Sequence, residues 1–204
     1  MHQAARVNVL AAIAALLVLC SSVPARAQTA SPDPYTPITS GERAKWIVEG
    51  SIGPRSLATG AFTSTWGTAI NSPHEWERTW SGFGKRFGDR EARVTISNSL
   101  EGGLGAIWGE DPRYGRLGRG GLWPRARHAL KSSVLARRRD GQLAPAWGRY
   151  VGDVASTAIA RTWLPPSATS AVGTTWSITN SVLGRMVGNA FAEFWPDARQ
   201  LLKK

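Results

Sequence analysis

Small and apolar residues recur at helical spacing along most of this chain, whereas the apolar and polar alternation typical of strands is scarce. Three stretches place small residues at every fourth position: Gly84, Gly88 and Ala92; Gly148, Gly152, Ser156 and Ala160; and Gly184, Gly188 and Ala192. Such residues lie one turn apart on a single helical face. Glycine costs about 1 kcal/mol relative to alanine inside a helix, and close approach of another backbone usually compensates for it. We therefore predict helix-packing roles for Gly84, Gly88, Gly148, Gly152, Gly184 and Gly188, with the three helices packed on one another.

Capping and helix-breaking residues divide the chain further. Thr39 and Glu42 have the spacing of a capping box, Pro54 suits a first helical turn, and Pro196 is expected to end the last helix. The predicted helices are 42–49, 54–72, 73–108, 123–138, 144–163 and 167–195. Residues 73–108 form either one long helix or two, with a kink or break expected near 102. A turn at Asp140–Gly141 and a glycine-rich loop at 113–121 separate some of them. The pattern predicts an all-α fold of about six helices with Gly- and Pro-rich loops.

The N-terminus is typical of a secretory signal helix. Arg6 precedes an apolar run from Val7 to Cys20, and Ala25–Arg26–Ala27 has the form of a cleavage site. Lipidation of Cys20 is the rival interpretation. It is disfavoured because the preceding Leu17–Val18–Leu19 places the large Leu19 directly before the cysteine, where a small residue is usual. We expect a signal peptide at 1–27, a flexible leader at 28–38, a single helical domain at 39–197 and a basic tail at 198–204. The cleaved chain would hold no cysteine, and therefore no disulfide or thiolate chemistry.

Basic residues concentrate in one part of the chain. Loss of Arg6 and Arg26 with the signal peptide lowers the formal charge from +11 to +9. Nine basic residues fall within 27 positions that contain no acid: Arg113, Arg116, Arg119, Arg125, Arg127, Lys131, Arg137, Arg138 and Arg139. Such a block indicates an anionic partner or a solvated face. Because export separates the protein from nucleic acid, an anionic lipid or envelope polymer is the expected partner.

The sequence leaves the relation to a membrane open. Close-packed glycine faces are common between helices in lipid but also occur in water-soluble domains. Residues 162–184 carry no charge over 23 positions but include Pro165 and Pro166, so they are a poor membrane span. Ten tryptophans are present, and tryptophan suits both protein cores and membrane interfaces. A peripheral or soluble protein is favoured over an integral helical oligomer.

Candidate catalytic groups are few. His74–Glu75 begins like a zinc-binding helix, but Arg78 stands where the second histidine of H-E-x-x-H is required. No phosphate-binding or nucleophile motif is present, so no catalytic residue, metal site or cofactor is predicted. An exported hydrolase using carboxylates remains an alternative, and its candidate acids are Glu75, Glu77, Glu110, Asp111, Glu193 and Asp197.

Two strings, Gly109 to Tyr114 (GEDPRY) and Asn189 to Asp197 (NAFAEFWPD), carry a resemblance. With Gly84 to Gly88 and Arg139 to Gly141, they make the chain similar to a family of uncharacterised exported proteins common in acidobacterial-type soil bacteria. The resemblance spans roughly 39–197. It implies export and a helical envelope protein, and it implies no activity.

These observations lead to one main hypothesis. The protein is expected to be a non-enzymatic helical protein of the cell envelope, in the periplasm or at the periphery of the outer membrane. Its basic segment would face anionic lipid or polymer, and it could form a homo-oligomer.

Overall fold

A computed structural model describes residues 35–201 of the chain. The predicted signal peptide, residues 28–34 of the predicted leader and the last three residues lie outside the described residues. Six helices of 13 to 31 residues make up most of the described part, which confirms the predicted all-α architecture. They are α2 (Ser40–Ile52), α3 (Pro54–Ala69), α4 (Trp80–Trp108), α5 (Leu122–Val134), α6 (Trp147–Ala160) and α8 (Ala171–Leu201).

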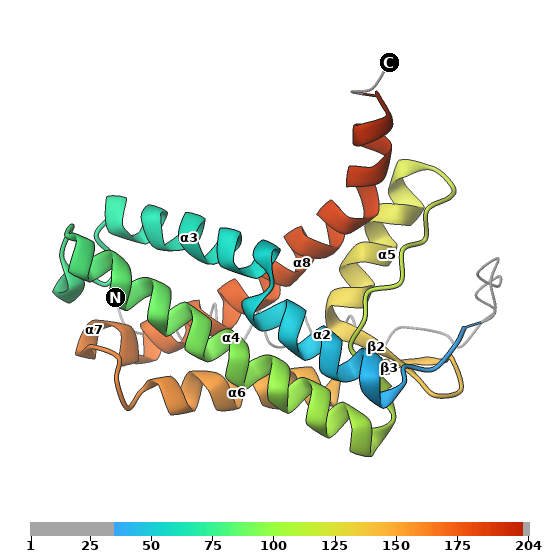
Figure 1. The fold of residues 1–204 in the computed structure, drawn as a ribbon, viewed down its shortest axis with the longest axis horizontal. Helices are drawn as coiled ribbons and strands as arrows, with labels where there is room; N and C mark the ends of the chain where they lie inside the picture. Colours follow the sequence, from blue (N-terminus) through green and yellow to red (C-terminus); the bar gives the residue numbers. More distant parts are fainter. Residues whose placement is uncertain (1–34, 202–204) are drawn as a thin grey trace. The chain divides into compact units, whose positions relative to one another are not determined.

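Helix α4 is the element around which the others are arranged (Figure 1). Helices α2 and α3 pack along one side of α4, and α6 packs along another. Helix α8 contacts α6 and, in its later turns, α5. The short helices η1 (His74–Trp76) and α7 (Pro166–Thr169) lie in the connections. Helix α6 therefore connects α4 with α8, because it contacts both.

Local sequence signals explain several helix ends. The Thr39–Glu42 capping box begins α2, with the Thr39 hydroxyl accepting from the Glu42 amide and the Glu42 carboxylate accepting from the Thr39 amide. Pro54 occupies the first turn of α3. Gly109, at φ +74°, ends α4 in the left-handed conformation that glycine adopts without strain.

Helix α4 runs unbroken for 29 residues, so the predicted break near residue 102 is wrong. The glycines there are sites of close contact with α2. A Cβ atom on Gly102 would lie 2.6 Å from the side chain of Ile47, and one on Gly105 would lie 2.9 Å from that of Arg43. Arg43 also donates to the carbonyl oxygens of Gly102 and Glu110 at 3.2 and 2.9 Å. Tertiary contacts thus compensate for the low helix propensity of glycine.

Residues 135–145 differ from the expected helices. They form strands β2 (Leu135–Arg138) and β3 (Leu143–Pro145), joined through the predicted Asp140–Gly141 turn. Strand β1 (Glu110–Asp111) pairs with β2, giving an antiparallel sheet in the order β1–β2–β3. The helix predicted over 123–138 therefore ends early, because backbone pairing with β1 and β3 takes over at Leu135.

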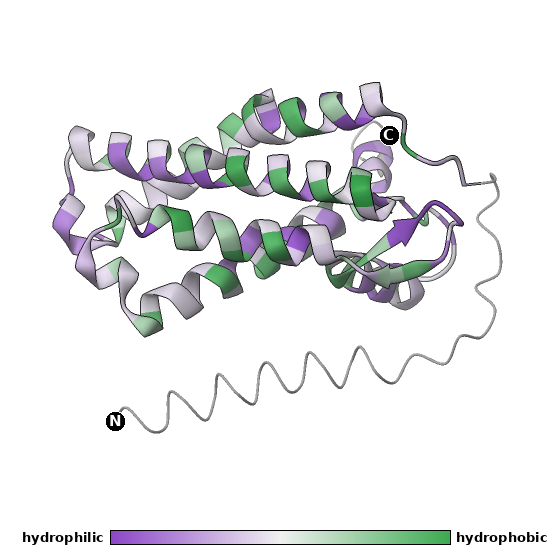
Figure 2. Cartoon of the chain, turned by 90° about the horizontal axis from the view of Figure 1, so that it is seen from below, coloured by the Kyte–Doolittle hydropathy of each residue, from purple (hydrophilic) through white to green (hydrophobic). Residues whose placement is uncertain are grey.

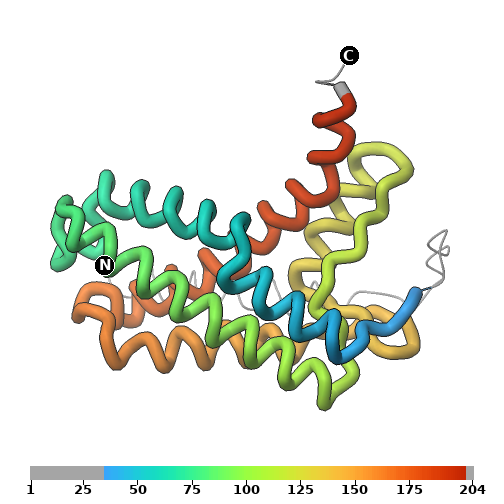
Figure 3. The backbone as a smooth tube through the Cα atoms, viewed as in Figure 1, coloured from blue at the N-terminus to red at the C-terminus, as the bar shows by residue number. Residues whose placement is uncertain are grey.

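Helix α8 continues through Pro196 to Leu201, so the prediction that Pro196 ends it is wrong. Proline in a helix interior lacks the N–H donor and crowds the preceding turn, which bends the helix without always ending it. The last turns of α8, red in Figure 3, change direction relative to the turns before them.

Only one of the three predicted small-residue ladders meets another helix. On α6, Gly148, Gly152, Ser156 and Ala160 are all buried. A Cβ atom on Gly152 would lie 2.7 Å from the backbone oxygen of Ser97 on α4. At Gly84, Gly88, Gly184 and Gly188, by contrast, no atom of the described residues lies within 4 Å of the position a Cβ would take. Those four glycines therefore do not pack the helices of this chain together.

Polar side chains are buried in this structure, and many large hydrophobic side chains are exposed. Within residues 35–200, the buried hydrophobic residues are four alanines: Ala129, Ala136, Ala146 and Ala160. The large hydrophobic side chains there are half-buried or exposed, and the exposed ones include eight of the ten tryptophans. Figure 2 shows hydrophobic residues recurring between hydrophilic ones along the helices. None of the helices in the described part combines the length and apolar character needed to cross a membrane.

A matched pair of alanine substitutions tests the packing of the ladders. Gly152→Ala should lower the melting temperature because its Cβ atom would collide with the α4 backbone. Gly188→Ala should raise it or leave it unchanged, because the site is open and alanine gains about 1 kcal/mol in helix propensity. Thermal melts followed by circular dichroism compare the two. Equal losses would show that another molecule covers the glycine face of α8.

Candidate functional site

Polar residues at four-residue spacing line the inward faces of α4, α6 and α8. We call this set the ionic seam. Its members on α4 are Asp89, Arg93, Ser97 and Glu101; on α6, Arg149, Asp153 and Thr157; and on α8, Ser177, Arg185, Asn189 and Glu193. Residues spaced by four fall on one helical face. The stripe of α8 meets α4 and α6 at Ser177 and Arg185, and it meets α5 at Asn189 and Glu193.

Glu101 is the centre of the ionic seam. Its carboxylate accepts from Arg149 on α6 at 2.8 Å and from Arg185 on α8 at 3.1 Å. Arg185 also lies 3.5 Å from Asp153, which accepts from the Ser97 hydroxyl at 2.8 Å. One buried carboxylate therefore joins the three helices.

Asp89 closes the seam near the beginning of α4. Its carboxylate accepts from the Trp163 indole N–H and from Arg93, both at 2.9 Å. Arg93 in turn donates to the hydroxyl of Ser177 on α8. This end of the seam therefore contains a carboxylate that accepts hydrogen bonds from two donors.

Glu193 forms the other end, and its side chain is fully buried. It accepts from the Tyr114 hydroxyl at 2.7 Å, from the amides of Leu117 and Gly118 at 2.9 Å each, and from the Arg125 guanidinium at 2.8 Å. Asp197, one turn later, pairs with Arg116 at 2.7 Å and with Arg125 at 2.6 Å. We call Tyr114, Arg116, Arg125, Glu193 and Asp197 the Glu193 cluster.

The Glu193 cluster keeps its acid ionised. Burial raises the pKa of Glu193, but hydrogen bonds from Tyr114, Arg125, Gly118 and Leu117 outweigh burial and lower the pKa to about 2. Burial and the bond to Glu193 raise the pKa of the Tyr114 phenol, which therefore stays protonated. Arg125 and then Arg116 lower the pKa of Asp197 through their hydrogen bonds. Groups held in this way bind the loop 113–118 to α8 and do not exchange protons near neutral pH.

The candidate acids of a hydrolase serve as structural ligands. Glu110 is buried and accepts from the amides of Trp147 and Gly148 at 3.1 and 2.9 Å, so it caps the start of α6. Glu75 accepts from the amide and hydroxyl of Ser167. Only Glu193 and Asp197 come together, and they do so on a shared arginine. No group of three or more His, Cys, Asp or Glu side chains suited to a metal occurs in residues 35–201.

The nine residues of the basic segment separate into two groups. Arg113, Arg116 and Arg125 form ion pairs with acids: Arg113 with Asp111 and Glu42, and the other two within the Glu193 cluster. Arg127, Arg138 and Arg139 are exposed, as is Arg119, while Lys131 and Arg137 are half-buried. The first group holds the fold together, so these nine residues do not form one continuous cationic face.

The ionic seam was missed in the sequence, although its signal is visible there. Asp89, Arg93, Ser97 and Glu101 repeat with the same four-residue period as the small residues, and so do Arg149, Asp153 and Thr157. Helix packing was predicted from the small residues on these helical faces, without the charged residues beside them. Charge patterns on exposed and interior faces have the same spacing, and only the partner helices distinguish them.

No family model, no curated protein and no solved structure matches this chain. The resemblance to a family of exported proteins therefore stays a prediction.

Glu193→Gln tests the energetic importance of the cluster. Removing one partner of a buried ion pair is expected to lower the free energy of unfolding by about 3–5 kcal/mol. Glu49→Gln is the control, since Glu49 is exposed and pairs with Lys45 at 3.7 Å on the surface. Denaturant unfolding in mild detergent measures both. A Glu193 variant as stable as the control would contradict the importance of the cluster.

The same carboxylate predicts acid sensitivity. The folded-state pKa of Glu193 is about 2, below the ordinary 4.5, so its ionised form stabilises the fold fully above pH 4.5. That stabilisation decreases as the pH falls from 4.5 towards 2. Melting temperatures across this range should fall more steeply for the wild type than for Glu193→Gln. Parallel curves would show that Glu193 does not contribute.

Proposed function

We propose that this protein is an exported, non-enzymatic protein of the cell envelope that associates with a membrane through its apolar outer side chains. The observation that carries the proposal is the inverted distribution of side chains. Exposed large hydrophobic residues occur on every long helix, for example Phe62 on α3, Val154 on α6 and Val187 on α8, which are 71%, 55% and 69% exposed. Buried positions hold charged residues, small polar residues and alanine.

The energetics of water exposure favour an apolar environment. Burying one large hydrophobic side chain stabilises a protein by roughly 1.5–3 kcal/mol. A typical domain has a net stability of only about 5–15 kcal/mol. Scattered exposed hydrophobics are ordinary on soluble proteins, but the near absence of large hydrophobics from the interior is not. Lipid around the outward faces supplies the apolar contacts that the interior lacks.

The ionic seam is consistent with the same environment. Charged side chains of proteins in lipid face the protein interior and pair with one another. Glu101, Arg149 and Arg185 are arranged in that way. The exposed tryptophans suit the boundary between headgroups and acyl chains, where an indole ring contacts apolar atoms and its N–H remains hydrated.

Exposed arginines extend the proposal to the headgroups. Arg127, Arg138 and Arg139 are exposed, and they are not among the arginines of the basic segment that form the ion pairs described above. Cations near a membrane surface are attracted to lipid phosphates, each by about 1 kcal/mol. These residues are the part of the predicted anion-binding segment that stays accessible.

A second candidate is self-association through α8. Gly184 and Gly188 face open space, and the neighbouring Val187 and Phe191 are exposed. Small residues four apart allow close helix contact in lipid. A second copy of the chain would therefore find a suitable face on α8, as the homo-oligomer hypothesis requires.

Catalysis by carboxylates has the least support. Glu193 is fully buried and accepts four hydrogen bonds. A hydrolase acid needs access to substrate and a pKa close to the working pH. Neither condition holds for Glu193.

Cell fractionation tests the proposed membrane association. The full chain should stay in the membrane fraction after washes with high salt and with alkaline carbonate, and detergent should release it. Release by salt alone would point to an electrostatic, peripheral attachment, because salt screens such contacts. A protein found in the soluble fraction would overturn the proposal.

Substitutions on the outer face identify the surface involved. The double variant Phe62→Ser and Trp66→Ser removes two exposed apolar side chains of α3 and should increase the fraction lost in the carbonate wash. Lys45→Ser, which changes an exposed polar side chain on α2, is the control and should behave as the wild type. Equal retention of all three proteins would exclude the α3 face from the contact.

A further inference from the structure

Two arginines of the Glu193 cluster meet at one carboxylate on the surface of the protein. Arg116 donates to one oxygen of Asp197 at 2.7 Å, and Arg125 pairs with the other oxygen at 2.6 Å. We propose that this arginine pair binds the phosphate of an anionic phospholipid, and that Asp197 is an internal competitor that occupies the site until lipid replaces it. The inference rests on the proposed membrane association and specifies the headgroup and its regulation.

The shared carboxylate shows that a single anion can bind both arginines. The nitrogen atoms of Arg116 and Arg125 that contact Asp197 lie within hydrogen-bonding distance of two oxygens on one carbon atom. The two unesterified oxygens of a phosphate diester are separated by a similar distance. Arginine binds either group because its planar donors can pair with two oxygens. The positions of the two guanidinium groups therefore already suit a phosphate.

Glu193 holds the two arginines in place without Asp197. Arg125 donates through Nε to the Glu193 carboxylate at 2.8 Å, and its guanidinium lies 4.7 Å from the centre of the Phe194 ring. Arg116 donates through Nε to the backbone oxygen of Glu193 at 2.9 Å. Each arginine therefore keeps a bond that exchange at Asp197 would not break. Such prior ordering lowers the entropic cost of binding a ligand.

Exposure distinguishes the exchangeable acid from the permanent one. The Asp197 side chain is 43% exposed and that of Arg116 is 34% exposed, whereas the Glu193 side chain is fully buried. Exposed ion pairs contribute little to stability, but a buried pair is costly to break. A change of rotamer can take the Asp197 carboxylate into solvent, where water satisfies it. Lipid is therefore expected to replace Asp197 and to leave Glu193 bound.

The charge that remains after this exchange matches one phosphate diester. Without Asp197, two guanidinium groups face the single carboxylate of Glu193, which leaves one positive charge. The phosphate of phosphatidylglycerol carries one negative charge. Residues 113–131 around the site include basic residues and no acid, so a zwitterionic headgroup would bring its ammonium group towards further cations. The site therefore favours an anionic headgroup.

Apolar side chains near the arginines suit the acyl chains of a lipid. Trp123, two positions before Arg125 on α5, is 69% exposed. Phe191 and Trp195 precede Asp197 on α8, are both exposed, and stack with their ring centres 5.0 Å apart. Free phosphate would use the arginines alone. The combination of arginines with exposed apolar side chains therefore favours a phospholipid over free phosphate.

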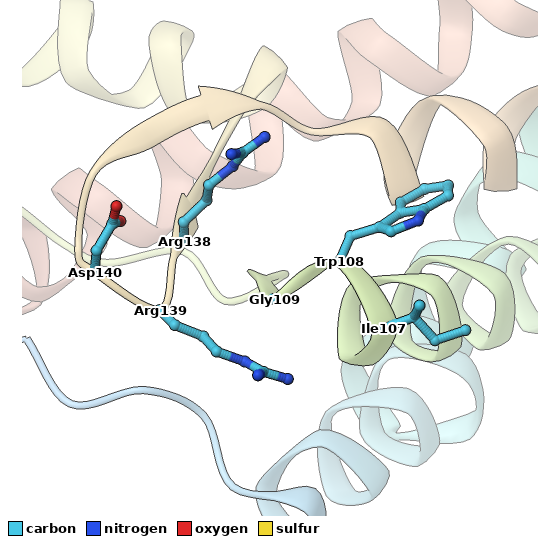
Figure 4. Close-up of a pocket in the computed structure, with 6 residues that line it drawn as sticks. All are labelled: Ile107, Trp108, Gly109, Arg138, Arg139 and Asp140. Carbon is cyan, nitrogen blue, oxygen red and sulfur yellow. The ribbon is translucent and has the colours of Figure 1, made fainter.

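The arginines at the end of α4 do not offer the same arrangement. Arg138 and Arg139 line a shallow pocket of about 250 Å³, but their guanidinium groups point to opposite sides of the chain where β2 ends (Figure 4). Arg139 donates to the Ala106 carbonyl at 2.9 Å. One phosphate could not bind both guanidinium groups, so the Glu193 cluster is the better headgroup site.

Native mass spectrometry of the purified full chain in detergent tests the inference by titration with phosphatidylglycerol. Asp197→Ala should strengthen binding about fivefold, because it removes a competing surface ion pair. Glu49→Ala, which removes an equal charge from an exposed position on α2, should leave binding unchanged. A gain of binding cannot result from unfolding. Equal binding by the wild type and both variants would overturn the inference.

A second substitution tests the arginines. Arg116→Gln, introduced into the Asp197→Ala protein, should weaken phosphatidylglycerol binding about tenfold, as expected for loss of a charged hydrogen bond. Arg127→Gln in the same protein removes an exposed arginine outside the cluster and should leave binding unchanged. Circular dichroism verifies that each variant is helical. Equal losses in the two double variants would overturn the site.

The lipid classes separate the possible sources of phosphate. The Asp197→Ala protein should bind phosphatidylglycerol more tightly than phosphatidylethanolamine. Equal binding of the two lipids would overturn the anionic class. Displacement of phosphatidylglycerol by an equal concentration of inorganic phosphate would overturn the assignment to a lipid.

Membrane retention in the carbonate wash provides the independent readout. It should be the same for Asp197→Ala and the wild type, because the apolar outer side chains are intact. Normal retention without a gain in phosphatidylglycerol binding would contradict only this inference, whereas a soluble wild type would contradict the membrane association itself.

Discussion

The pairing of buried charges between α4, α6 and α8 constrains the whole structure. A buried carboxylate without a partner is strongly destabilising, so Glu101 requires Arg149 and Arg185 close by. These pairs rotate each helix so that its polar stripe faces inward. The opposite faces, which carry the large hydrophobic residues, must then face outward. The apolar exterior is therefore a consequence of the ionic interior.

Small residues and charges cooperate on α6. Gly148 and Gly152 allow its backbone to approach α4 closely, at the level where Arg149 and Asp153 meet their partners. Without the close approach, side chains as short as Ser97 could not reach across. The glycine faces of α8 and of early α4 have the same spacing but no partner among residues 35–201. If the protein lies in lipid, as proposed, these faces remain available to a second molecule.

Local features of this fold could be predicted from the sequence, whereas pairings across the chain could not. The Thr39–Glu42 box and the Asp140–Gly141 turn depend on neighbours within a few residues. The small-residue ladders have the same local spacing, yet only the ladder of α6 lies against another helix, because that depends on α4. Arg125 and Glu193 are 68 positions apart, and nothing in either segment identifies the other. The basic segment was for that reason assigned to an external anion, although Arg125 has its acid within the same chain. Strand β2 was missed because its pairing with β1 is also non-local.

Helix α8 follows α4, α5 and α6, which hold its ionic partners, in the sequence. Its 31 residues supply Arg185 to Glu101 and Asp153, and supply Glu193 to Arg125. A chain that stops before α8 would contain α4, α5 and α6 with several charges lacking their counter-ions. The ionic interior therefore forms only after synthesis has passed α8. A prematurely ended product would carry both unpaired charges and apolar outer faces, which are features that proteases and chaperones recognise in incomplete proteins.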